Sequence, residues 1–187
     1  MTQPHPQPAA SNPNGKWDGT IKFDRVFSMP NKNTFEMKPA REFIYEYIGW
    51  YGQSNRSYDP FCGTSKFALF RNDIRQTGID STDWLQSLED ECAERVYFDP
   101  PYSPRQLKEC YDDIGETLHD TKSSVWKNWK YEIARITQPG GYVLSFGNNS
   151  VGIGNCNGFE MERIRLIPHG GNHYDTICTA ERKRDAP

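Results

Sequence analysis

Three aspartates in this sequence, Asp59, Asp73 and Asp99, each follow a short apolar run of the kind that forms a β-strand. In open sheets of parallel strands, ligands bind beyond the carboxyl ends of the strands. Three carboxylates at that edge would face a group that carries hydroxyls, amines or positive charge. A single aspartate after a strand is as readily a helix cap, but the three together favour a binding site.

The tetrapeptide Asp99-Pro100-Pro101-Tyr102 is the strongest chemical signal. Its two prolines fix the backbone and remove two N–H donors, so no adjacent donor competes for the carbonyls of Asp99 and Pro100. A carboxylate and a fixed carbonyl are two acceptors, which match an exocyclic amine with two N–H groups. Tyr102 offers a flat face on which a base can stack. The alternative is a rigid turn without chemistry, but its place after the apolar residues 95–98 favours a site.

The elements that must position these residues alternate between strand and helix. The segment 38–48 places Phe43, Ile44, Tyr47 and Ile48 on one helical face, and Pro39 suits its first turn. Further helices are predicted over 84–88, 104–119 and 123–136, the last one stopped by the Pro-Gly-Gly at 139–141. Strands are predicted over 56–59, 67–70, 95–98, 142–146, 160–167 and 174–181. This alternation predicts an α/β fold with a mostly parallel, twisted sheet and helices on both faces.

Over about residues 22–180 the chain resembles the S-adenosylmethionine-dependent amino-methyltransferases of DNA, in particular small phage- and prophage-encoded members. Asp99 to Tyr102 is similar to their motif IV, and Asp59-Pro-Phe-Cys-Gly63 is similar to motif I, which holds the methionine part of the cofactor. The stretch from Asn33 to Pro39 resembles motif X. Asn72-Asp73-Ile74 resembles motif II, whose acid takes the ribose hydroxyls, and Asp80 resembles the motif III acid near the cofactor's adenine.

This resemblance implies a Rossmann-like class I methyltransferase fold and methyl transfer from S-adenosylmethionine to the N6 amine of adenine in double-stranded DNA, with the base flipped out of the helix. The catalytic residues it implies are Asp99, Pro100, Pro101 and Tyr102. The cofactor-binding residues it implies are Lys38, Asp59, Phe61, Cys62, Gly63, Asp73, Ile74 and Asp80. It implies no metal.

Other functions remain open from the sequence. The same tetrapeptide suits methylation of the N4 amine of cytosine in DNA or of a base amine in RNA. A protein from another class, a non-catalytic binding protein on the same fold, is also compatible with the altered motif I.

Two departures from the family pattern concern the turn after residue 59. Ser65 stands where the family usually has a second glycine. Only residues 62–66 separate motif I from the next predicted strand, whereas a parallel crossover normally needs a dozen residues or more. We therefore expect the first crossover helix to be missing. The alternative is that residues 65–75 form this helix and Asp80 ends the second strand.

Several residues that could suggest other chemistry have simpler interpretations. Cys62 is predicted to line the cofactor pocket rather than to act as a nucleophile. His169 and His173 flank two glycines, which argues against a helical zinc pair and favours a loop near the base or a phosphate. Trp126 and Trp129 either stack on nucleic acid beside Arg105, Lys122, Lys127 and Lys130, or lie in the core of an amphipathic helix.

Length and composition bound the remaining questions. The 187 residues carry a net charge of −3 and suit one domain, predicted over 19–182 between tails at 1–18 and 183–187. No apolar run is long enough to span a membrane, and no secretory signal is evident. Five widely spaced cysteines predict the reducing cytoplasm of a bacterial, archaeal or phage-infected cell. Because no large target-recognition domain fits, short loops or a homodimer would have to share the DNA contacts.

Overall fold

The computed structural model describes residues 19–48, 55–115, 124–171 and 173–185. Seven strands form one sheet: β1 (Lys22–Arg25), β2 (Ser57–Asp59), β3 (Phe70–Arg71), β4 (Ala93–Phe98), β5 (Thr137–Gly147), β6 (Phe159–Ile167) and β7 (Thr176–Lys183). The helices are η1 (Thr34–Glu36), α1 (Lys38–Ile48), α2 (Ile74–Thr77), α3 (Ser81–Gln86), α4 (Pro104–Asp112), α5 (Ser124–Ile136) and η2 (Asn155–Asn157). None of these helices is long and apolar enough to cross a membrane.

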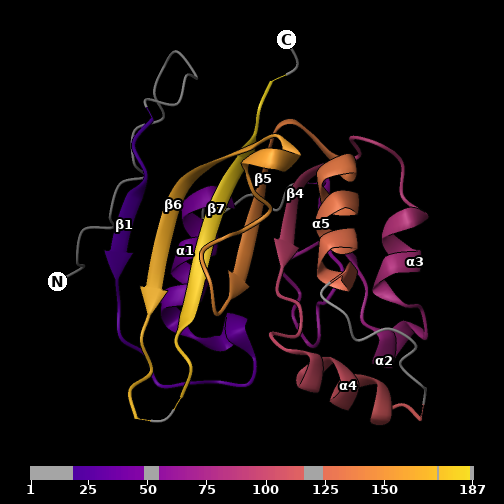
Figure 1. Cartoon of the computed structure of the whole chain (residues 1–187), viewed down its shortest axis with the longest axis horizontal. Coiled ribbons are helices and arrows are strands. Elements are labelled where there is room, and N and C mark those ends of the chain that lie inside the picture. The colour runs from indigo at the N-terminus through magenta and orange to yellow at the C-terminus, as the bar shows by residue number, and fades with distance from the viewer. Residues whose placement is uncertain (1–18, 49–54, 116–123, 172, 186–187) are drawn as a thin grey trace, which may run out of the picture.

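The strand order in the sheet is β1-β6-β7-β5-β4-β2-β3. The described strands pair in parallel except where β7 runs antiparallel to its neighbours β5 and β6. Helix α1 covers one face of the sheet, and α3 and α5 cover the other (Figure 1). The sequence-based prediction of a mostly parallel sheet with helices on both faces is thus confirmed.

Each face of the sheet has its own hydrophobic core, and β4 and β5 contribute to both. Val96 and Val143 point to the α5 side, where they join Trp129 and Ile133. Tyr97 and Leu144, which follow these valines in the chain, pack on the α1 side with Phe43 and Ile44. This alternation follows from the two-residue period of a strand, and it makes β4 and β5 central, since both their faces are buried.

The connection from β2 to β3 contains no helix. The two strands are nonetheless parallel neighbours, with Tyr58 opposite Phe70. The prediction that the first crossover helix is missing is confirmed. Asp80 caps α3 rather than ending a strand, so the alternative in which it closes the second strand is wrong.

Some predicted boundaries differ from the structure. Of the apolar run at 67–70, only Phe70 lies in a strand, and this strand ends at Arg71. Phe67 and Ala68 lie before the strand and pack into the core. Helix α4 ends at Asp112, short of the predicted residue 119. Helix α5 ends at Ile136, three residues before Pro139, and β5 begins at the next residue, so Pro139 lies within the strand. Strand β7 runs through Lys183, whose ammonium donates to the carbonyls of Ala134 and Thr137, so the sheet reaches into the predicted C-terminal tail. The predicted N-terminal tail lies outside the described residues.

Strand β1 was not predicted, because Lys22–Arg25 is mostly polar and lies at the sheet edge. It is held by charge rather than by apolar burial. The buried Arg165 of β6 donates to Asp24 at 2.8 Å, to Glu46 of α1 at 3.0 Å and to the Pro39 carbonyl at 3.0 Å. This network fixes α1 and β1 to the sheet and so anchors the segment that carries η1.

Candidate active site

A cavity of about 930 Å³ lies where β2, β3 and β4 end, and it is closed on one side by η1. Ten of the twelve site residues predicted from the sequence line it: Phe61, Cys62, Gly63, Asp73, Ile74, Asp80, Asp99, Pro100, Pro101 and Tyr102. The other two, Lys38 and Asp59, do not.

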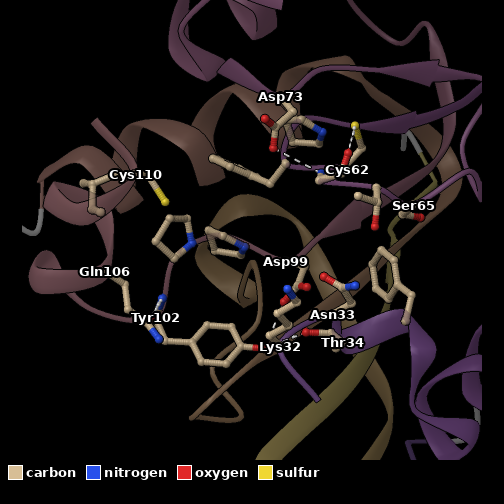
Figure 2. Close-up of a pocket in the computed structure, with 18 of the residues that line it drawn as sticks. Lys32, Asn33, Thr34, Cys62, Ser65, Asp73, Asp99, Tyr102, Gln106 and Cys110 are labelled. Carbon is tan, nitrogen blue, oxygen red and sulfur yellow. Dashed lines mark hydrogen bonds between the residues drawn. The ribbon is translucent and has the colours of Figure 1, made fainter. Parts of the chain in front are cut away.

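Asp99 and Tyr102 are joined directly within the turn after β4. The Tyr102 hydroxyl donates to Asp99 Oδ1 at 2.9 Å, and the Thr34 hydroxyl lies 3.2 Å from the Tyr102 hydroxyl oxygen. Figure 2 shows the Tyr102 ring reaching toward Asp99, with Thr34 beside it. Thr34 is buried and comes from η1, so it links the start of α1 to the end of β4 across 68 positions of the sequence.

The electrostatic environment of Asp99 makes its carboxylate unusual. Burial raises the pKa of Asp99 to about 6, although hydrogen bonds from Thr34 and Tyr102 pull it down. Asp59 at the end of β2 and Cys178 on β7 also interact electrostatically with Asp99. A carboxylate that is costly to ionise and still faces a cavity is a good candidate for a functional acceptor.

The Pro100-Pro101 turn is fixed by side chains from two helices. The Trp126 indole N–H of α5 donates to the Pro101 carbonyl at 3.0 Å. At the start of α4, Gln106 Oε1 accepts the Tyr102 backbone N–H at 2.6 Å, and the cap residue Ser103 accepts from the Gln106 N–H at 3.2 Å. Both contacts engage the peptide group between Pro101 and Tyr102, so α4 and α5 together fix the end of the turn that carries Tyr102.

The turn after β2 is held by Asp59 and by the adjacent strand β3. Asp59 Oδ1 accepts the Phe61 N–H at 3.0 Å, and the Cys62 N–H donates to the Asn72 carbonyl at 2.9 Å. Asp59 Oδ2 is buried without a hydrogen-bond partner, and burial raises the pKa of this carboxyl well above its usual range. Asp59 therefore shapes the floor beneath the cavity, although it was predicted to contact the cofactor.

Gly63 and Ser65 explain how the altered turn is tolerated. Gly63 has a φ of +51°, a conformation that suits glycine. Among the described residues other than glycine, Glu91 alone has a positive φ, so Ser65 takes an ordinary conformation. The Ser65 hydroxyl also accepts the Phe67 N–H at 3.3 Å. A second glycine is therefore not required by the backbone at this position.

Asp73 and Asp80 are both helix caps as well as cavity residues. Asp73 caps α2 through the Arg75 N–H, and its other oxygen accepts the Gly63 N–H at 3.2 Å, which ties β3 to the turn after β2. Asp80 caps α3 through the Thr82 N–H at 2.7 Å and also accepts from the Tyr111 hydroxyl. The helix-cap interpretation is right for Asp73, but Asp59 and Asp99 cap no helix.

The prediction that Lys38 lies at the cofactor site is wrong in its placement. Its side chain is 79% exposed and pairs with Glu42 one turn along α1. Lys38 starts the helix, and most of the lining residues of this segment, from Pro30 to Glu36, precede it. Lys32 and Arg41 line the cavity instead.

Cys62 lines the cavity as a protonated thiol. It is 7% exposed, and burial together with Asp59 and Asp73 raises its pKa to about 11. A thiol with a raised pKa is a poor nucleophile. This agrees with the expectation that Cys62 is a lining residue.

His169 is a buried structural histidine at the cavity wall. Its Nδ1 lies 2.9 Å from the Ser28 carbonyl, and its Nε2 lies 2.9 Å from the Thr176 hydroxyl. Both ring nitrogens are therefore engaged, in joining the segment after β1 to β7. His173 is exposed at the cavity rim.

The two tryptophans of α5 belong to the hydrophobic core. Trp129 is 1% exposed and donates to the Thr82 hydroxyl at 3.0 Å, and Trp126 packs at the edge of the same core. The core interpretation is thus confirmed for Trp129, whereas Trp126 is only partly buried. Of the basic residues near them, Arg105 is paired with Glu109, Lys127 is exposed, and Lys122 lies outside the described residues.

Thr34, Gln106 and Trp126 position the site, and the sequence did not predict this role for any of them. For Gln106 a signal exists, because Ser-x-x-Gln with proline at the first helical position is typical of a helix start. For Thr34 and Trp126 no local signal exists, since their roles depend on contacts with a distant turn.

Comparison with known proteins supports the fold. No protein-family model and no curated protein matches the sequence. The structure resembles 1,6-didemethyltoxoflavin-N1-methyltransferase from Burkholderia thailandensis, solved with 1,6-didemethyltoxoflavin and S-adenosylhomocysteine; the TM-score is 0.51 at 10% identity, over 79% of this chain and 78% of that one. TrmN from Thermus thermophilus gives a TM-score of 0.49 at 12% identity over 79% of this chain, which spans about half (49%) of TrmN. The chain has the Rossmann-like α/β fold of class I methyltransferases.

Proposed function

We propose that this protein transfers a methyl group from S-adenosylmethionine to the N6 amine of adenine in double-stranded DNA. The observation that carries the proposal is the position of Asp99. Its carboxylate lies at the carboxyl end of β4, within the large cavity, on a turn fixed by two prolines and held by Trp126 and Gln106. The resemblance of the Asp99 to Tyr102 tetrapeptide to motif IV supports the same assignment.

The cavity suits S-adenosylmethionine in size and charge. A volume of about 930 Å³ leaves room for a nucleoside cofactor together with a base. The carboxylates of Asp73, Asp80 and Asp99 all line it and favour a cationic sulfonium. The turn from Phe61 to Gly63 would hold the methionine part, Asp73 the ribose and Asp80 the adenine. When bound, the cofactor supplies an electrophilic methyl group.

Asp99 and Pro100 would accept the two N–H groups of the target amine. The lone pair of this amine is delocalised into the ring, so the nitrogen is a poor nucleophile. Two acceptors favour a pyramidal nitrogen and stabilise the positive charge that develops on it during attack, which is selective stabilisation of the transition state. A carboxylate can accept several hydrogen bonds, so the amine can join the Tyr102 hydroxyl at Asp99.

The protonation state of Asp99 sets the pH range of this reaction. With a pKa of about 6, Asp99 is mostly ionised at pH 7.5 and accepts hydrogen bonds. Below pH 6 the protonated carboxyl loses one acceptor position. The rate should therefore fall as the pH falls through about 6.

The decisive experiment measures methyl incorporation from labelled S-adenosylmethionine into DNA and RNA, followed by nucleoside analysis. We expect N6-methyladenine in DNA. Asp99→Ala should abolish methylation, while calorimetry with S-adenosylmethionine should show nearly unchanged binding, because the turn after β2, Asp73 and Asp80 would still hold the cofactor. Asp112→Ala serves as the control, since Asp112 is an exposed carboxylate paired with Lys108 outside the cavity.

The other outcomes separate the alternatives. N4-methylcytosine in DNA, or a methylated base in RNA, would replace the adenine assignment while keeping the chemistry. No cofactor binding at millimolar concentration would favour a non-catalytic binding protein. Full activity in Asp99→Ala would refute the role of Asp99.

A further inference from the structure

A second pocket of about 300 Å³ lies behind the turn that follows β4. Pro100, Pro101 and Tyr102 line both this pocket and the large cavity, so the turn forms a shared wall. Asp99 lines only the large cavity. A target amine at Asp99 must therefore lie in the large cavity, and the second pocket is free to take a different group.

The second pocket contains a buried hydroxyl without a partner. Ser145 of β5 is 8% exposed, and its Oγ has no hydrogen bond within the described structure. A buried polar atom left unpaired carries a free-energy cost that a ligand with a matching donor or acceptor would remove. Ser145 lines the pocket, so a ligand bound there would lie next to this buried hydroxyl.

The loop after β5, which forms another wall, is already fixed. Glu181 of β7 is 1% exposed and accepts the Ile153 N–H at 2.6 Å and the Gly154 N–H at 2.9 Å. Figure 1 shows this segment returning across the sheet from the end of β5 toward η2. The pocket is therefore formed before any ligand binds, which lowers the entropy cost of binding.

The remaining lining residues indicate a flat, polar-edged and anionic ligand. Tyr102 and Trp126 provide aromatic surface, on which a base can stack. Asn148 and Asn149 provide carboxamides, which both donate and accept hydrogen bonds. Lys130 provides a cation at the wall of the pocket, and partial burial lowers its pKa. Desolvation strengthens the attraction between such a cation and an anion.

We propose that the second pocket binds a nucleotide next to the target base in the nucleic-acid substrate, with a polar atom of its base edge at the Ser145 hydroxyl and its phosphate toward Lys130. This assignment rests on the proposed function, because the two pockets share the turn from Pro100 to Tyr102, so a nucleic acid with one base at Asp99 would bring a neighbouring nucleotide to the other side of this turn. The pocket then contributes to the choice of target sequence without touching the reacting amine.

The test titrates the ¹⁵N-labelled protein with the four deoxynucleoside 5′-monophosphates and follows the amide signals by NMR. We expect saturable shifts at the Gly147 and Gly152 amides and at the Trp126 indole. Ser145→Ala should weaken this binding about fivefold, the effect of one neutral hydrogen bond. Lys130→Met should weaken binding of the monophosphates but not of the corresponding nucleosides.

Thr179→Val is the matched control. Thr179 lies opposite Ser145 on β7, and its hydroxyl is also buried and unpartnered, but it lines neither pocket. This variant should bind the nucleotides as the wild type does. The proposal would be overturned if Ser145→Ala bound the nucleotides as tightly as the wild type does, or if the NMR shifts were confined to residues of the large cavity. It would also be overturned if phenyl phosphate bound as tightly as the nucleotides. The test needs no methyl transfer, so nucleotide binding here by a protein without methylation activity would refute only the proposed function.

Discussion

The carboxylate of Asp99, which we propose as the acceptor of the target amine, carries a cost in stability. Its carboxylate is taken largely out of water and receives compensation from the hydroxyls of Tyr102 and Thr34, yet its pKa stays raised at about 6. Because the pKa is higher in the folded protein than in the unfolded chain, the folded state binds more protons between pH 4 and 6. The carboxyl group therefore destabilises the protein as the pH rises through this range.

Replacing the charge at this position should stabilise the protein. We expect Asp99→Asn to raise the free energy of unfolding at pH 7.5 by about 1–3 kcal/mol, since the amide oxygen can still accept from Tyr102 without desolvating a charge. Near pH 4 the gain should largely disappear. Urea denaturation at both pH values measures the difference.

The control for this prediction is Asp112→Asn. Asp112 is exposed and paired with Lys108 on the surface of α4, so its replacement should change stability by no more than about 0.5 kcal/mol at either pH. Equal stabilisation by the two substitutions would show that the environment of Asp99 is not the cause.

At the scale of elements, three connections at one edge of the sheet build the large cavity and the second pocket. The turn after β2 is held by β3, the turn after β4 is held by α4 and α5, and the loop after β5 is held by β7. In each case a side chain or backbone group from another element satisfies the polar groups of the connection, as Glu181 does for Ile153 and Gly154. Rigid loops of this kind allow a site to be formed by residues far apart in the sequence.

The loop after β5 gives an element-scale prediction. Gly152 has a φ of +57°, and a Cβ there would lie 2.1 Å from Glu181 Oε2. Gly152→Ala should therefore lower the free energy of unfolding by about 2–4 kcal/mol, through backbone strain and displacement of the Glu181 carboxylate. It should also broaden the amide signals of residues 147–154.

The variant Gly158→Ala separates the cost of backbone strain from the cost of displacing the Glu181 carboxylate. Gly158 has a φ of +87° but no atom within 4 Å of the added Cβ, so this variant carries the strain without the clash. We expect it to cost about 1 kcal/mol. If both variants cost the same, the contact with Glu181 does not determine the loop.

At the scale of the whole molecule, the two cores share one sheet. Strands β4 and β5 place alternate side chains into the core under α1 and the core under α5. If either core loses its packing, one face of these two central strands is exposed to water, which destabilises the strands that the other core also needs. The described structure should therefore unfold as one cooperative unit.

Substitutions in either core test this cooperativity. Phe43→Ala on α1 and Ile133→Ala on α5 each remove a fully buried side chain and should lower the free energy of unfolding by about 2–5 kcal/mol. In both variants, circular dichroism at far-ultraviolet wavelengths and tryptophan fluorescence should report the same transition. Separate transitions in either variant would mean that the two faces unfold independently.

Much of the architecture could be predicted from local patterns. The apolar runs, the helical face around Phe43, and the carboxylates at strand ends depend on neighbouring residues, so they are visible in the sequence. The short spacing after Gly63 likewise predicted the missing crossover helix. Strand β1 could not be predicted, because its pairing depends on Asp24 meeting Arg165, which lies far along the chain.

The order of residues along the chain determined which chemical groups stand at the ends of β2, β3 and β4, since strand and helix periodicity is a local property. Only the tertiary structure decided which groups meet there. It placed Thr34 beside Tyr102, the Trp126 indole at the Pro101 carbonyl, Lys38 in solvent and Ser145 in a second pocket. These contacts join segments whose relative position is set by packing on the sheet, so no pattern of neighbouring residues could contain them.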